Sequence, residues 1–98
     1  KPSGEGKTEK ESAWKQNGWK WQYMADGETV HDGWRQIDGS WYFFDADGFM
    51  HMGWLYDGGY WYYLESRAGS DCGKMIVGIR RINGKEYSFD ASGACQTL

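Results

Sequence analysis

Short runs of aromatic residues recur along this chain, and polar turn signals separate the runs. The clearest run is Trp41-Tyr42-Phe43-Phe44, which follows Asp38-Gly39. Aromatic residues favour β-strands, and Asp-Gly and Asn-Gly pairs accept the positive φ of tight hairpin turns. No stretch has a helical period. The pattern predicts a series of β-hairpins, with turns at Asn17-Gly18, Asp38-Gly39, Asp57-Gly58-Gly59 and Asn83-Gly84.

The hairpins are copies of one repeat. Residues 34–44 match residues 54–64 at a spacing of twenty positions. Looser copies begin at Trp14 and at Ile79, the latter displaced by five extra residues in a turn. Repeat architectures tolerate insertions best at such places. We predict a flexible polar linker over residues 1–12, followed by four repeats at residues 13–32, 33–52, 53–77 and 78–98.

Aromatic side chains take the place of a conventional aliphatic core. The chain has 98 residues, room for one small domain, and 18% of them are aromatic, including seven Trp and seven Tyr. Each such ring can bury about 150–250 Å². A single two-stranded hairpin is marginally stable in water, whereas stacked copies bury one another's faces. The expected fold is an all-β solenoid of stacked β-hairpins.

Charge and motifs exclude several functions. The formal net charge is −3 without a basic face, which argues against a nucleic-acid partner, and no apolar run reaches the roughly 20 residues of a membrane span. No acid–base pair, nucleophilic grouping or cofactor motif is singled out, so we expect neither an enzyme nor a cofactor. Asp45-Ala-Asp-Gly48 is predicted to be a turn rather than a calcium loop. No metal-ligand spacing accompanies Cys72 and Cys95, and the sequence leaves open whether these two form a disulfide.

The repeats share an order of short motifs, which is clearest from Gly33 to Leu64. The order is Gly-Trp, then Asp-Gly, then Trp-Tyr with two further aromatics, then Asp-Gly-x-Met and the next Gly-Trp. It resembles the choline-binding or cell-wall-binding repeats of Gram-positive surface proteins, phage lysins and autolysins. Repeats of clostridial toxins and streptococcal glucan-binding enzymes share much of it, and residues 82–90 are closer to that second group. The resemblance implies a secreted module at a bacterial cell surface, folded as a left-handed superhelix of hairpins.

The resemblance also implies ligand sites in the grooves between successive hairpins, each an aromatic box with a methionine nearby. The best box combines two indoles of the second repeat with one of the third: Trp34, Trp41 and Trp61, flanked by Met50. A second box takes the equivalent positions one repeat earlier, with valine in place of methionine: Trp14, Trp21, Trp41 and Val30.

A third box has Trp54, Trp61 and Met75, but Glu86 stands where the family pattern expects an aromatic ring. The fourth repeat has lost both Trp, with Ile79 and Glu86 in their place, so we expect a degenerate terminal cap. Cys95 falls at its methionine position. We expect the remaining large residues of the return strands to be packing residues: Tyr42, Phe44, Tyr62, Leu64, Tyr87 and Phe89.

The favoured ligand is choline on teichoic acid, because a quaternary ammonium has no N–H to donate and is held by cation–π attraction and methyl burial. Two alternatives stay open. The same fold could bind a glucan or another cell-surface glycan by stacking sugar rings on flat Trp faces. It could instead be a structural spacer with every Trp buried and Met50 and Met75 filling gaps, and terminal hairpins are also a candidate surface for a homodimer.

Overall fold

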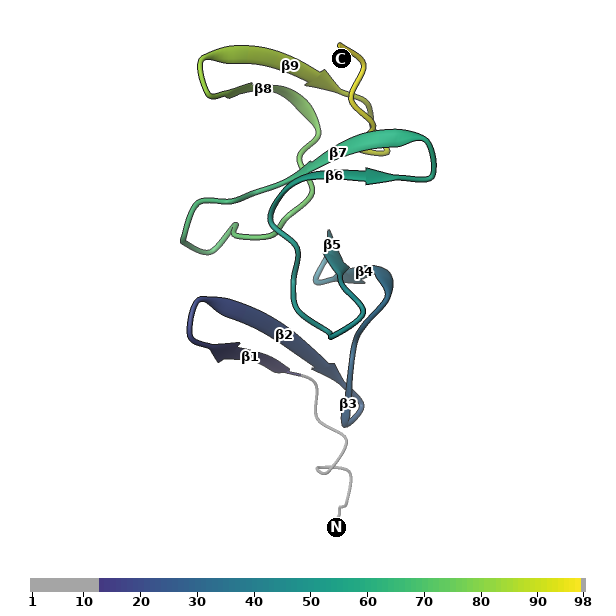
Figure 1. Ribbon diagram of the computed structural model, residues 1–98, viewed down its shortest axis with the longest axis vertical. Helices are drawn as coiled ribbons and strands as arrows, with labels where there is room; N and C mark the ends of the chain where they lie inside the picture. The colour runs from purple at the N-terminus through teal and green to yellow at the C-terminus, as the bar shows by residue number, and fades with distance from the viewer. Residues whose placement is uncertain (1–12, 98) are drawn as a thin grey trace. The chain divides into compact units, whose positions relative to one another are not determined.

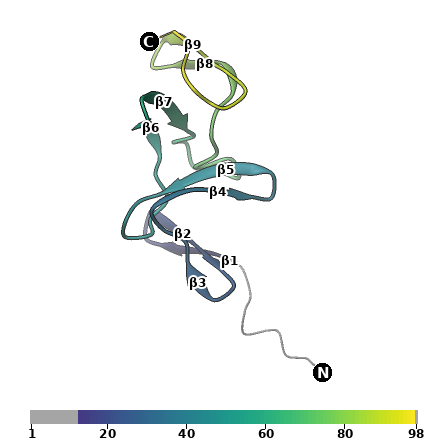
Figure 2. The ribbon, with the colours of Figure 1, turned by 90° about the vertical axis from the view of Figure 1, so that its right-hand side faces the viewer.

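The computed structural model describes residues 13–97, so the predicted linker at 1–12 lies outside the described residues. Every regular element in this part of the chain is a strand (Figure 1). The strands in chain order are β1 (Ala13–Asn17), β2 (Lys20–Ala25), β3 (Glu28–Thr29), β4 (Gly33–Ile37), β5 (Ser40–Phe44), β6 (Gly53–Asp57), β7 (Tyr60–Leu64), β8 (Gly78–Ile82) and β9 (Lys85–Phe89). Consecutive strands pair within separate small sheets, and Figure 2 shows β4 and β5 side by side as one such hairpin. The predicted all-β hairpin architecture is confirmed.

Tight two-residue turns close the hairpins. Asn83 and Gly84 have φ of 52° and 82°, as a type I′ turn requires, and Asp38 and Gly39 match them at 51° and 85°. The prediction at Asn17-Gly18 is wrong by one residue, because Asn17 pairs with Lys20 and the turn is Gly18-Trp19. Glycine at the first central position, here with φ of 68°, is the pattern of a type II′ turn.

The segment after each return strand folds back onto that strand. In the first repeat it forms β3, which pairs with β2 through Met24↔Thr29. In the later repeats it makes a single bridge, and these bridges join Phe44 to Met50, Leu64 to Met75 and Phe89 to Cys95. Met50, Met75 and Cys95 are therefore equivalent, as the repeat alignment predicts.

The chain divides into two compact lobes. Of the described residues, 13–35 and 43–50 form the N-terminal lobe, and 36–42 and 51–97 form the C-terminal lobe. Within each lobe, one repeat is tied to the one before it by a backbone hydrogen bond. The Met50 amide donates to the Trp21 carbonyl at 2.7 Å in the N-terminal lobe. In the C-terminal lobe, the Met75 amide donates to Trp41 at 2.9 Å and the Cys95 amide to Trp61 at 2.8 Å.

The buried side chains recur at fixed places in the repeat. Phe44 and Leu64 are fully buried, and Phe89 at the equivalent position is only 3% exposed. The ends of the leading strands, Ile37 and Ile82, are buried as well. Tyr42 is buried, as expected for a packing residue, and burying a large apolar side chain of this kind contributes about 1.5–3 kcal/mol. Tyr62 and Tyr87 are half-buried.

Acidic side chains organise the turns after the return strands. The Asp45 carboxylate accepts hydrogen bonds from the amides of Asp47 (3.0 Å) and Phe49 (2.9 Å), so the Asp45 segment is a turn as predicted. Asp90 does the same for Ser92 and Ala94. Glu65 occupies this position in the third repeat, where the inserted residues lengthen the turn. Its carboxylate is buried and accepts hydrogen bonds from the Arg80 guanidinium and the Arg67 amide.

Two turn glycines let neighbouring repeats approach closely. A Cβ on Gly48 would lie 2.7 Å from the Thr29 methyl carbon, and a Cβ on Gly93 would overlap the Met75 sulfur and stand 2.8 Å from its Cγ. Both glycines also have positive φ, of 87° and 90°. At both positions glycine is favoured by the backbone conformation, and a larger residue would also have to displace a neighbouring side chain.

We expect Gly93→Ala to lower the free energy of unfolding by about 1–3 kcal/mol, because the added methyl overlaps Met75. Urea denaturation measures this loss. The matched control is Gly84→Ala, at a similar φ of 82° with no atom near the added Cβ. This variant should lose only the stability that a positive φ costs an alanine. Equal losses in the two variants would contradict a packing role for Gly93.

The buried Glu65 predicts a pH dependence of stability. Burial by itself raises the pKa of this carboxyl, but the hydrogen bonds from Arg80 and from the Arg67 amide outweigh it and hold the pKa below its ordinary 4.5. A lowered pKa stabilises the fold above the unfolded value, and this contribution disappears as the pH falls through the folded pKa.

Glu65→Gln should therefore lower the free energy of unfolding by roughly 1–3 kcal/mol at neutral pH. The difference from wild type should shrink well below pH 4.5, the ordinary value for the carboxyl. Thermal or urea unfolding across this pH range measures it. Glu86→Gln, at an exposed glutamate on β9, should follow the wild-type curve. A Glu65→Gln deficit that does not change with pH would contradict the role of the charge.

Candidate aromatic binding site

In the first and third repeats, strand pairing places the two indoles on one face of their hairpin. In the first repeat Trp14 pairs with Tyr23 and Gln16 with Trp21. In the third repeat Trp54 pairs with Tyr63 and Tyr56 with Trp61. Residues two apart on a strand, and residues directly opposite on neighbouring strands, share a face of the sheet. The two Trp of a repeat are therefore diagonal neighbours on a common face.

These diagonal neighbours form an aromatic corner, by which we mean the two perpendicular indoles of one repeat. The ring centroids of Trp14 and Trp21 are 6.2 Å apart with an interplanar angle of 87°. Trp54 and Trp61 have the same separation, 6.2 Å, and an angle of 83°. A cation that lies within about 6 Å of a ring centroid is attracted by its π-face. Each corner can thus offer two ring faces to one small cation.

The leading indole of each corner is held by its neighbours. Trp54 contacts Tyr63 at 5.2 Å between centroids, Tyr87 at 4.9 Å and Phe89 at 5.9 Å. Trp14 contacts Tyr23 at 5.0 Å and Phe44 at 6.0 Å in closely similar orientations. These contacts leave the leading indoles half-buried and fixed in place. A wall that is fixed before the ligand arrives loses little conformational freedom on binding.

The indoles at the start of the later return strands are more open. Trp41 is 40% exposed and Trp61 is 41% exposed, although their backbone carbonyls accept the hydrogen bonds from Met75 and Cys95. The backbone of these residues thus serves the stacking of repeats. Their side chains remain accessible to a ligand.

The structure brings together some of the predicted box residues. It joins Trp14 to Trp21 and Trp54 to Trp61. In the second box Val30 is buried, and Trp41 belongs to the other lobe. In the first box, Trp34 and Met50 belong to the N-terminal lobe and Trp41 and Trp61 to the C-terminal lobe, so that box stays a prediction. Trp34 itself contacts Phe43 at 5.3 Å between centroids.

The two methionines have packing contacts. Met50 is buried. The side chain of Met75 lies against the backbone at Gly93, in the turn of the next repeat. Methionine fills irregular gaps of this kind well. The structure thus gives both residues a structural role, and their predicted place beside a ligand stays a prediction.

Sequence reasoning missed two aromatic contacts. Tyr56 lies 5.1 Å from Trp61 between centroids, and Tyr87 packs on Trp54 although Glu86 was the position compared with the family pattern. The signal for Tyr56 was its place in the repeat, since it is the cross-strand partner of Trp61. The signal for Tyr87 was strand alternation, because it shares its face with the buried Phe89.

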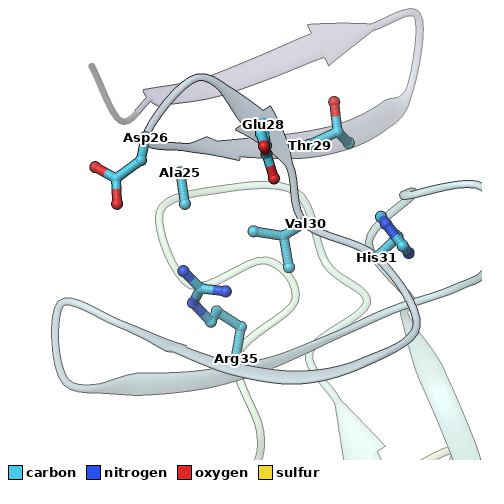
Figure 3. A pocket seen from close by; sticks show the side chains of 7 residues that line it. All are labelled: Ala25, Asp26, Glu28, Thr29, Val30, His31 and Arg35. Carbon is cyan, nitrogen blue, oxygen red and sulfur yellow. The ribbon is translucent and has the colours of Figure 1, made fainter. Parts of the chain in front are cut away.

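A separate cavity of about 460 Å³ lies in the N-terminal lobe (Figure 3). Its walls come from the turn after β2, from β3 and from β4, and the Arg35 guanidinium points into it. The lining residues are Ala25, Asp26, Glu28, Thr29, Val30, His31 and Arg35. No Trp, Tyr or Phe is among these described lining residues, so the cavity lacks the π-faces that a quaternary ammonium needs.

Other chemistries find little support in residues 13–97. No three His, Cys, Asp or Glu side chains in that range are placed to hold a metal ion. A long apolar helix of the kind that crosses a membrane is not found there either. Cys72 and Cys95 are both free thiols, and the Cys72 sulfur lies 3.3 Å from the sulfur of Met52.

Comparison with known proteins identifies the repeat. Residues 31–70 match the family model described as a choline-binding repeat. The multimodular pneumococcal cell wall endolysin from phage Cp-1, complexed with choline, is 32% identical over 95% of this chain and 28% of its own, with a TM-score of 0.78. Choline binding protein F from Streptococcus pneumoniae is 32% identical over 89% of this chain and 28% of its own, with a TM-score of 0.76.

The chain thus spans little more than a quarter of the length of those two proteins. A search of curated proteins returned no match. The choline binding domain of Spr1274 from Streptococcus pneumoniae is 39% identical, and the match covers 67% of this chain and 94% of that domain, with a TM-score of 0.57. These likenesses confirm the resemblance that the sequence pattern predicts: the chain belongs to the choline-binding repeat family.

Proposed function

We propose that this chain is a non-catalytic module that binds the choline groups of bacterial teichoic acid and so holds a secreted protein at the cell surface. The observation that carries the proposal is the aromatic corner, which recurs with the same 6.2 Å spacing in the first and third repeats. The family and the choline-bound endolysin support the choice of ligand.

The chemistry of choline fits such a corner. Its trimethylammonium group cannot donate a hydrogen bond, so it gains most from aromatic faces that replace water around its methyl groups. Each ring contributes about 0.5–2 kcal/mol, depending on how far the site excludes water. After the cost of association, two or three rings give binding on the order of millimolar, which corresponds to about −4 kcal/mol.

Weak single sites suit a polymeric ligand. Teichoic acid would present many choline groups to several corners of one chain, and each bound group raises the effective concentration of the next. Such multivalency strengthens binding by roughly 10²–10⁴ without any new contact. This is a functional reason for repetition, beside the burial of hairpin faces.

The alternative functions differ in whether the indole rings must be buried or exposed. A spacer with every Trp buried conflicts with Trp41 and Trp61, which are each about two-fifths exposed. A glycan-binding module would use the same exposed faces to stack sugar rings, and it is the second candidate. Homodimerisation through the terminal hairpins stays a prediction.

We expect choline to perturb the Trp emission of the wild-type chain with a millimolar midpoint. Trp61→Ala should weaken this binding several-fold, because it removes one wall of the corner formed with Trp54. Trp19→Ala is the matched control, since Trp19 lies at a hairpin turn, is 71% exposed and belongs to no corner. It should leave choline affinity unchanged.

Titration by calorimetry and by fluorescence measures both variants, with thermal unfolding to verify that each is folded. A wild-type chain that ignores choline at tens of millimolar but responds to glucans would favour the glycan module. Equal choline affinity for Trp61→Ala and wild type would remove Trp61 from the site.

A further inference from the structure

The third repeat lacks the ring that the family pattern takes from the following repeat, since Glu86 stands at that position. It has an extra ring of its own, however. Tyr56 occupies the place where the first, second and fourth repeats have polar residues, namely Gln16, Gln36 and Arg81. We propose that Tyr56 completes a cation site within the third hairpin itself, as the third aromatic wall beside Trp54 and Trp61. This inference rests on the proposed function.

Geometry supports the proposal. Tyr56 is the direct cross-strand partner of Trp61, and Trp54 is two residues before it on the same strand, so all three rings share one face. The Tyr56 and Trp61 centroids are 5.1 Å apart with an angle of 53°, and the Trp61 and Trp54 centroids are 6.2 Å apart at 83°. The three rings therefore form a continuous aromatic surface that turns through a corner.

Two of these rings are exposed where a ligand can reach them, and the third, Trp54, is half-buried. Tyr56 is 59% exposed and Trp61 is 41% exposed, although they contact each other. The apolar faces left open by this pair are the kind of surface that marks a binding site. In the first repeat, by contrast, Gln16 is the cross-strand partner of Trp21, so no ring stands there at the position of Tyr56.

The fourth repeat supports two of these rings. Tyr87 and Phe89 pack on Trp54, and the Cys95 amide is hydrogen-bonded to the Trp61 carbonyl. The cap thus fixes Trp54 and Trp61. Tyr56, at 59% exposed, is the most open of the three rings.

The chemistry of this site selects quaternary ammonium compounds such as choline. The three rings offer π-faces and an apolar surface for methyl groups. A sugar ring, the competing ligand class, would need flat stacking and flanking hydrogen-bond donors, so its binding at these rings is the alternative that the experiment must separate.

The experiment follows the indole N–H signals of the ¹⁵N-labelled chain by NMR during a choline titration. Trp54 is the reporter, because it belongs to no other predicted box. In wild type its signal should shift with a millimolar midpoint. Tyr56→Gln, which installs the residue of the first two repeats, should raise that midpoint by about 2- to 20-fold. Tyr56→Phe, which keeps the ring, should retain wild-type affinity.

Tyr60→Gln is the matched control. Tyr60 is 58% exposed on the same hairpin, nearly the same as Tyr56, but it pairs with Asp57 and so lies on the opposite face. It should leave the Trp54 titration unchanged. Thermal unfolding verifies that Tyr56→Gln is folded, and the Trp14 and Trp21 signals should titrate as in wild type.

Two failures are distinguishable. If no indole signal moves with choline in wild type, the proposed function fails and this inference fails with it. If Trp14 and Trp21 respond but Tyr56→Gln titrates at Trp54 as wild type does, the function stands and Tyr56 is only a packing residue. A Trp54 signal that moves with glucan oligosaccharides and not with choline would also overturn the inference.

Discussion

In each lobe, an amide after one hairpin donates a hydrogen bond to the carbonyl of the first Trp in the return strand of the preceding repeat. Met75 and Cys95 do this for Trp41 and Trp61, and Met50 does it for Trp21. In Trp21 and Trp61, the residue whose backbone accepts this bond is also the residue whose indole forms an aromatic corner. One residue thus takes part both in joining successive repeats and in the candidate site.

Aromatic side chains make this arrangement sufficient for stability. Trp54 packs with one part of its surface on Tyr87 and Phe89 and takes part in the corner with Trp61. One residue thus contributes to the core and to the candidate site. A Leu or Val could fill the first role but would offer no π-face for the second. This dual use explains why a chain so short has so few aliphatic residues and so many rings.

The sequence was sufficient to predict the hairpins, most turns and the equivalence of Met50, Met75 and Cys95, because all of these follow from local periodicity and turn chemistry. It predicted the first turn one residue too early, since Asn17 pairs with Lys20 and the glycine opens the turn instead of ending it. It also missed Tyr56 as a ring beside Trp61. The residues that face one another across a hairpin depend on the register of its two strands. A shift of one residue at the turn would move the side chains of a strand to the opposite face. The partners of Trp54 in the next repeat depend on stacking, which no local pattern encodes.

The insertion after β7 leaves the stacking hydrogen bonds of its repeat intact. Residues between Leu64 and Gly73 lengthen that turn, yet the Met75 amide still donates its hydrogen bond to the Trp41 carbonyl. The Glu65 carboxylate accepts hydrogen bonds from Arg67 in the loop and from Arg80 on β8. The hydrogen bond between these repeats is thus made whatever the length of the connecting turn. A repeat array of this kind can accept foreign peptide in such a loop, and evolution or an engineer can lengthen it there without breaking that bond.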